Sequence, residues 1–191
     1  SARRLPIQYS RIEPSDLADL RERGCEVLVV AGYPWRVPPI EPHLPYGFNV
    51  HPSPLPEGRG PYPLFQAVTS GRTEWGVAVH KLAPDFDTGD ILVRETFPLH
   101  ADETHDTLLT KCQLSAARLA RILAADLPGV WSRAQPQGQG TYWPRQGDEN
   151  RTMDFSAGVE ACLRLMRAFG SIETIAHVGG TTVYVGEARG W

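Results

Sequence analysis

The chain has 191 residues, of which 41% are hydrophobic and 21% are charged, as in an ordinary globular protein with one full domain and a small appendage. It contains no apolar run of about 18 residues, so we expect no transmembrane helix, and its N-terminus lacks the apolar core of a signal peptide. A net charge of −3, with two lysines in total and no cluster of basic residues, argues against a nucleic-acid partner.

The first part of the chain predicts one strand, one helix and a second strand before a stiff loop. The first strand is expected over 5–10, and the helix from an N-cap at Ser15 to Arg23. The nearly continuous apolar run CEVLVVA, Cys25–Ala31, predicts a buried parallel strand. Residues 32–45 contain five prolines, which predict a loop without regular structure.

Further along, apolar and alternating patterns predict three more strands and two more helices. The strands are expected over 47–51, 74–82 and 91–99, the helices over 62–70 and 102–125, and loops over 52–60 and 83–90. A helix followed by a buried parallel strand is half of a βαβ unit, so we expect the fold class to be α/β.

The C-terminal part of the chain predicts a small α+β appendage. A helical pattern over 157–169 precedes two extended runs, 172–178 and 181–188, which a Gly-Gly pair separates as in a β-hairpin. The segment PQGQGTYWPR before them predicts a linker that crosses the surface. The expected division is a main domain over 1–130, a linker over 131–149 and the appendage over 150–191.

The three cysteines, Cys25, Cys112 and Cys162, are odd in number and far apart. Because no C-x-x-C spacing is present, they predict neither a zinc site nor a disulfide framework. As core thiols they fit a reducing cytoplasm, which is the location we expect. The acidic residues near position 87 lack the glycine and the distal glutamate of a calcium loop, so no metal site is predicted.

Three polar side chains suggest a chemistry. Asn49 and His51 are two residues apart in an expected strand, so their side chains share one face. Asp87 lies in the loop after another strand. An amide can donate to a developing oxyanion, an imidazole can move a proton, and a carboxylate can orient or charge the imidazole. Together these groups are what transfer of an acyl group between two amines requires.

The order and spacing of these residues resemble those of a known family. The segments are Asn49-Val50-His51, Ser53-Pro54-Leu55-Pro56, Arg59-Gly60 and Asp87-Thr88-Gly89. They resemble the pattern N-x-H-x-S-x-L-P-x-x-x-G followed by D-x-G of the 10-formyltetrahydrofolate-dependent formyltransferases, which act on glycinamide ribonucleotide, methionyl-tRNA, sugar nucleotides or hydroxyornithine. The resemblance extends from about Leu5 to the C-terminus.

The resemblance implies a Rossmann-like formyltransferase sheet and 10-formyltetrahydrofolate as the formyl donor. It implies that Asn49 and His51 donate to the oxyanion, while Asp87 raises the pKa of His51 and takes part in proton transfer to N10 through water. It also implies that the pterin is held by residues of two loops. These are Pro34, Trp35, Val37, Leu82, Ala83, Asp85 and Phe86.

Family members begin with a segment that supplies the first strands of the sheet and holds the anionic group of the acceptor, and nothing in this chain matches it. Because a sheet that starts at Cys25 would expose a hydrophobic edge, we expect that the sequence omits such a segment. The residues that recognise the acceptor would then lie largely outside this sequence.

Several other residues are expected to be structural. Ser53 is expected to bond to loop backbone, and Trp35 has an alternative role as a ring that covers the end of the sheet. His80 shares a strand face with Ala78 and Leu82, so it is expected to face either the core or the wall of the pocket. No other candidate catalytic residue accompanies the remaining histidines in the sequence, which are His43, His100, His105 and His177.

The leading functional hypothesis is formyl transfer from 10-formyltetrahydrofolate to a small amine, such as an amino sugar nucleotide or a hydroxyornithine-like amino acid. A methionyl-tRNA formyltransferase is one alternative, although the acidic net charge and the short C-terminal part argue against it. A formyltetrahydrofolate hydrolase, with water as the acceptor, is another. A non-enzymatic folate-binding remnant is the third, and a homodimer is compatible with each hypothesis.

Overall fold

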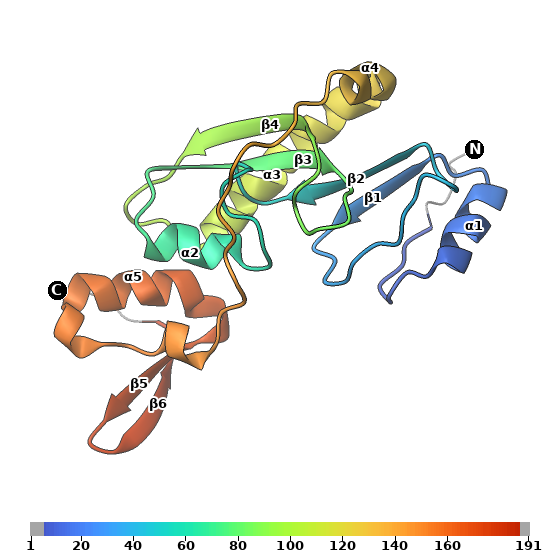
Figure 1. Ribbon diagram of the computed structural model, residues 1–191. Coiled ribbons are helices and arrows are strands. Elements are labelled where there is room, and N and C mark those ends of the chain that lie inside the picture. The colour runs from blue at the N-terminus through green and yellow to red at the C-terminus, as the bar shows by residue number, and fades with distance from the viewer. Residues whose placement is uncertain (1–5, 188–191) are drawn as a thin grey trace.

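The chain folds around one mixed sheet of four strands (Figure 1). The structure, a computed structural model, describes residues 6–187. Strands β1 (Val27–Ala31) and β2 (Tyr46–His51) pair in parallel, and β3 (Glu74–Lys81) pairs antiparallel with both β2 and β4 (Ile91–Pro98). The sheet order is therefore β1-β2-β3-β4, and the predicted α/β class is confirmed.

Helices cover the sheet and the space beside it. The long helix α3 (His105–Ala125) packs against β3 and β4, and it begins at the N-cap Thr104, whose hydroxyl accepts the Thr107 N–H at 3.1 Å. The short helix α2 (Pro63–Thr69) contacts α3. No helix among residues 6–187 is long and apolar enough to span a membrane.

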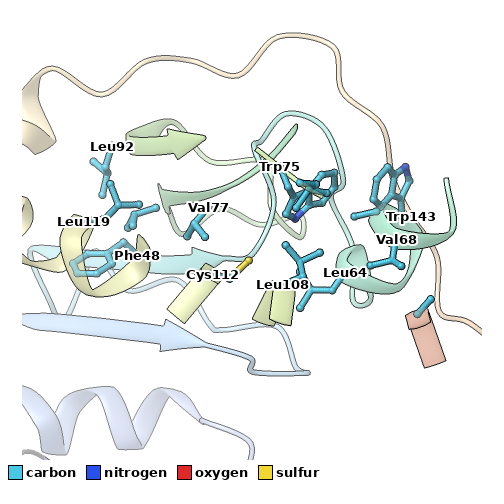
Figure 2. Packing of buried hydrophobic residues seen from close by; sticks show 14 of the residues in the cluster. Phe48, Leu64, Val68, Trp75, Val77, Leu92, Leu108, Cys112, Leu119 and Trp143 are labelled. Atoms are coloured by element: carbon cyan, nitrogen blue, oxygen red, sulfur yellow. The ribbon is translucent and has the colours of Figure 1, made fainter. Parts of the chain in front are cut away.

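The main core lies between the sheet and these helices (Figure 2). Phe48, Val77 and Leu92 contribute from the strands, and Leu108 and Leu119 contribute from α3. All of these side chains are buried. A second, smaller cluster joins α1 to the loop over 32–45.

Two expectations near the N-terminus were wrong. Residues 6–10 form no strand, because they are exposed and pair with no strand in the described part of the chain, and residue 5 lies outside that part. Helix α1 (Pro14–Glu22) has Glu13 rather than Ser15 as its N-cap. Pro14 suits the first turn, where no N–H is needed, and Asp16 Oδ2 accepts the Glu13 N–H at 2.8 Å.

Strand β1 is less buried than the sequence predicts. Its parallel pairing with β2 is confirmed. However, β1 is the edge strand of the described sheet, and Val29 is 58% exposed. Leu28 points the other way and packs on the cluster around Leu17. The apolar run at 25–31 therefore does not correspond to burial on both faces.

Helix α4 (Leu127–Ser132), which the sequence did not predict, follows α3 directly and overlaps the start of the expected linker. Pro128 lies in its first turn, where a missing N–H costs nothing. The Asp126 carboxylate accepts the Gly129 N–H at 2.9 Å and caps the helix. Pro128 and Gly129 are thus both compatible with a short helix.

The C-terminal helix and hairpin are confirmed. Helix α5 (Val159–Phe169) precedes β5 (Thr174–Val178) and β6 (Thr181–Val185), which pair antiparallel; residue 188 lies outside the described residues. Short 3-10 turns connect these elements at Asp148–Arg151, Phe155–Ala157 and Gly170–Ile172. Phe169 stacks on Phe65 of α2 with 4.7 Å between ring centroids, so α5 packs on the main core. The division of the chain at 130 and 149 remains a proposal.

The segment 135–143, which we call the strap, carries the chain from α4 toward the C-terminal unit (Figure 1). Gln135 forms an antiparallel bridge with Ile91, and Tyr142 forms a parallel bridge with Arg59. Trp143 stacks on the buried Trp75 with 5.2 Å between ring centroids. The strap is therefore attached to the sheet and to the loop that follows β2.

We expect the Leu108→Ala substitution to lower the free energy of unfolding by about 2–5 kcal/mol, because Leu108 is fully buried where α3 meets the sheet. Leu114 on the same helix is 57% exposed, so Leu114→Ala should change the free energy of unfolding by about 0.5 kcal/mol or less. Urea unfolding followed by circular dichroism measures both values. Equal losses in the two variants would contradict the packing described for α3.

Candidate active site

The structure brings Asn49, His51 and Asp87 together, although they come from separate parts of the chain. Asn49 and His51 lie on β2, and Asp87 lies in the loop between β3 and β4. The Oδ1 atom of Asp87 is 3.2 Å from Asn49 Nδ2 and 3.5 Å from His51 Nδ1. Both His51 and Asp87 are buried. An amide, an imidazole and a carboxylate thus meet at one oxygen atom.

The carboxylate of Asp87 is held by the backbone as well as by side chains. Its Oδ2 atom accepts the Gly60 N–H at 2.9 Å. Asp87 itself has φ of 58°, a left-handed conformation that aspartate tolerates better than most residues. Gly60 has φ of 109°, and a Cβ there would overlap the carbonyl oxygen of Trp143. The glycine at position 60 is therefore required for its N–H to reach the carboxylate.

A fourth side chain, His80, belongs to the same cluster. It lies opposite Asn49 in the pairing of β2 with β3 and is 2% exposed. Its Nε2 atom is 3.2 Å from Asn49 Nδ2 and 3.4 Å from Asp87 Oδ1. Of the two positions expected for His80, the wall of the pocket is the one that the structure shows. The position of His80 beside Asn49 follows from the register in which β2 and β3 pair. The alternation of residues along one strand cannot predict that register.

The backbone partners of the two imidazoles decide where their hydrogens lie. His51 Nε2 is 2.9 Å from the Gly58 carbonyl oxygen, and His80 Nδ1 is 2.8 Å from the Lys81 carbonyl oxygen. Since a carbonyl only accepts, each of these nitrogens carries a hydrogen. The other nitrogen of each ring then faces Asp87 Oδ1. In the neutral state it is a proton acceptor, so each ring can take up a proton beside the carboxylate.

Burial and the neighbouring groups set the charges of the site. Burial lowers the pKa of His51 below its ordinary value, against the opposing influence of the Asp87 carboxylate and the Gly58 carbonyl. The expected effect of Asp87 on His51 is thus present, but burial outweighs it. Burial acts to raise the pKa of Asp87, but the imidazoles of His80 and His51, when they carry an added proton, and the Gly60 N–H together lower it below its ordinary value. The resting site therefore contains an ionised Asp87 beside a neutral His51.

A pocket opens beside this cluster, and Asn49, His80 and Asp87 form part of its wall. Six of the seven residues expected to hold the pterin line it: Trp35, Val37, Leu82, Ala83, Asp85 and Phe86. The seventh, Pro34, is exposed and is not among the residues that line this pocket. Four further residues that the sequence did not predict also line the pocket: Val30, Tyr33, Arg36 and Pro84.

The mouth of the pocket is built from the two predicted loops. Trp35 contacts Tyr33 edge to face, with 5.3 Å between ring centroids. Arg36 forms an ion pair of 3.3 Å with Asp85, and its guanidinium lies 5.5 Å from the Phe86 ring centroid. Apolar and aromatic walls with a few polar groups are typical of sites for flat, partly polar ligands. Within residues 6–187, no cluster of three or more His, Cys, Asp and Glu side chains could hold a metal ion.

We expect the wild-type chain to lose stability as the pH falls below about 6.5, the ordinary pKa of histidine. The pKa of His51 is lowered by folding, so between its folded and unfolded pKa values the unfolded state binds more protons and stability rises with pH. His51→Gln should therefore flatten the dependence of unfolding free energy on pH between about 7 and 5. Urea unfolding at several pH values tests this, and an unchanged slope would contradict a buried neutral His51.

Comparison with known proteins agrees with this geometry. Residues 8–120 match the model of a family described as formyl transferase. A methionyl-tRNA formyltransferase from Janthinobacterium sp. (strain Marseille) is 33% identical over 174 residues, which cover 87% of this chain and 54% of that protein. The methionyl-tRNA formyltransferase from Acidiphilium cryptum is 30% identical, with 84% of this chain and 46% of that protein covered. The chain thus spans about half the length of these relatives.

Solved structures show the same fold at low sequence identity. A sugar N-formyltransferase from Shewanella superposes with a TM-score of 0.73 at 20% identity, covering 93% of this chain and 75% of that one. HypX from Aquifex aeolicus in complex with tetrahydrofolic acid superposes with a TM-score of 0.67 at 21% identity, covering 90% of this chain and 31% of that one. These likenesses confirm the predicted Rossmann-like formyltransferase fold. Together with the match over more than half of its length, they show that the chain belongs to the formyl transferase family.

Proposed function

We propose that the protein transfers a formyl group from 10-formyltetrahydrofolate to the amine of a small molecule. The observation that carries this proposal is the position of Asn49, His51 and Asp87 beside the pocket. Two of these residues, Asn49 and Asp87, form part of its wall. HypX, which has the same fold, was solved with tetrahydrofolic acid, and this supports a folate as the group that fills the pocket.

In the proposed reaction the acceptor nitrogen attacks the formyl carbon while the donor lies in the pocket. A new C–N bond forms and the formyl oxygen becomes an oxyanion; the bond from carbon to N10 then breaks. The proton that the acceptor amine loses replaces the formyl group on N10. His51 can take up this proton beside Asp87, which would then stabilise the imidazolium at a distance of 3.5 Å.

Asn49 is proposed to stabilise the oxyanion, and this requires an exchange of hydrogen bonds. In the resting site its amide donates to both His80 and Asp87 at 3.2 Å. One of these bonds would be replaced by a bond to the formyl oxygen when the donor binds. Since both partners stay fixed by backbone groups, the amide is held close to its working position before the substrate arrives.

A sugar amine is the acceptor that we favour within this class. The Shewanella sugar N-formyltransferase has the same fold, and the net charge of −3 is unfavourable for a polyanionic acceptor such as tRNA. The two relatives named above, from Janthinobacterium and Acidiphilium cryptum, are methionyl-tRNA formyltransferases, so methionyl-tRNA is the second candidate. Offering the protein the donor with either amino sugar nucleotides or methionyl-tRNA separates the two. Loss of the formyl group without any amine would instead indicate a hydrolase, and no loss a folate-binding remnant.

We expect Asn49→Ala to lower kcat for formyl transfer by a factor of about 10²–10³, since a donor to the oxyanion is lost. Asp87→Ala should be at least as damaging, because His51 and Asn49 both lose their shared partner. Formation of tetrahydrofolate at saturating donor measures both. Asp90→Asn is the control, because Asp90 is in the same loop and pairs with Lys81 rather than with the cluster. Normal turnover in either of the first two variants would remove these residues from the proposed mechanism.

We expect Ala83→Trp to weaken tetrahydrofolate binding at least about tenfold, because the larger side chain would fill part of the pocket. Calorimetric titration of the protein with tetrahydrofolate measures the affinity without any acceptor. Pro34→Ala is the matched control, because Pro34 belongs to the facing loop but does not line the pocket. Equal affinity in the Ala83→Trp variant and the wild type would show that the folate binds elsewhere.

A further inference from the structure

The strap contacts both loops that hold the catalytic cluster. One loop, 56–60, supplies the Gly58 carbonyl to His51 and the Gly60 N–H to Asp87. The other loop, 83–90, contains Asp87 itself. The strap lies outside both loops in the sequence, and it is the part of the chain that the sequence predicted to be a simple surface linker.

The main chain of the strap is bonded to the first loop at several points. The Arg59 N–H donates to the Thr141 carbonyl at 3.0 Å, and the Trp143 N–H donates to the Arg59 carbonyl at 2.6 Å. The Gly58 N–H donates to the Thr141 hydroxyl at 3.0 Å. These bonds fix the residues on both sides of the Gly58 carbonyl, which is the partner of His51.

One strap side chain, Gln137, reaches the second loop. Its Nε2 atom donates to the Asp87 carbonyl oxygen at 2.9 Å and to the Gly89 carbonyl oxygen at 2.6 Å. Its Oε1 atom accepts from Arg59 Nε at 3.1 Å and from Arg59 Nη2 at 2.8 Å. Gln137 is half-buried and uses both ends of its amide, so through Arg59 it joins the two catalytic loops.

We propose that Gln137 is a positioning residue for the Asp87 carboxylate, acting through the backbone of residues 87 and 89. The proposal rests on the proposed formyl transfer for its kinetic test, but the contacts on which it is based are independent of the substrate. Asp87 has φ of 58°, and such a conformation persists only where its surroundings hold it. Its carbonyl is held by Gln137 and its carboxylate by Gly60, so the two bonds together set the direction of the side chain.

Two variants separate this role from simple attachment of the strap. Gln137→Ala removes the bonds to both loops, whereas Gln137→Glu keeps an acceptor for Arg59 but replaces the donor with an oxygen that faces two carbonyls. We expect both variants to lower kcat about ten- to a hundredfold, with the KM for the acceptor little changed. The control is Gln135→Ala, because the Gln135 side chain is exposed and, among residues 6–187, bonds only to the Arg133 carbonyl.

The second measurement needs no substrate. The ring ¹⁵N signals of His51 and His80, assigned with the His51→Gln and His80→Gln variants, report the position of the nearby carboxylate. We expect these signals to shift in both Gln137 variants and to stay in place in Gln135→Ala, with folding checked by circular dichroism. If the wild type transfers no formyl group, the proposed function fails and the ring signals alone decide the role of Gln137. Wild-type ring signals together with wild-type kcat in either Gln137 variant would overturn the proposal.

Discussion

The buried carboxylate of Asp87 is the constraint on which the rest of the site depends. A charged oxygen that is removed from water is costly unless it is hydrogen-bonded. Here the Gly60 N–H and the Asn49 amide donate hydrogen bonds to the carboxylate, and the imidazoles of His51 and His80 lie 3.5 and 3.4 Å from its Oδ1 atom. These groups come from β2, β3 and the loop over 56–60, so one side chain requires the correct placement of all three.

The two histidine side chains lie beside the same carboxylate, but different hydrogen bonds hold them. His51 and His80 face the same carboxylate oxygen, yet each is tied to a different carbonyl, one in a loop and one in its own strand. His80 also accepts a hydrogen bond from Asn49, so it helps to orient the amide. His51 lacks that bond, so its Nδ1 atom is the one that we propose takes up a proton during the reaction.

Local patterns in the sequence were sufficient for what depends on neighbours along the chain. The motif around Asn49 and His51, the long helix at 102–125 and the C-terminal hairpin are of this kind. The missing information concerned contacts between distant segments. His80 enters the site because β2 and β3 pair in one register out of several possible, and Val29 is exposed because β1 is an edge strand in the described sheet. Neither fact can be read from the periodicity of one strand.

In the strap, the residue types alone do not reveal the local structure. Its glycines and its proline predicted a linker that crosses the surface. A Cβ at Gly140, however, would overlap the carbonyl oxygen of Pro56, as one at Gly60 would overlap that of Trp143. Glycine at these positions permits two backbones to approach closely, which is the opposite of freedom. Since flexibility and close approach both favour glycine, only the position of the opposing segment distinguishes a loose connection from one that is fixed against the loop over 56–60.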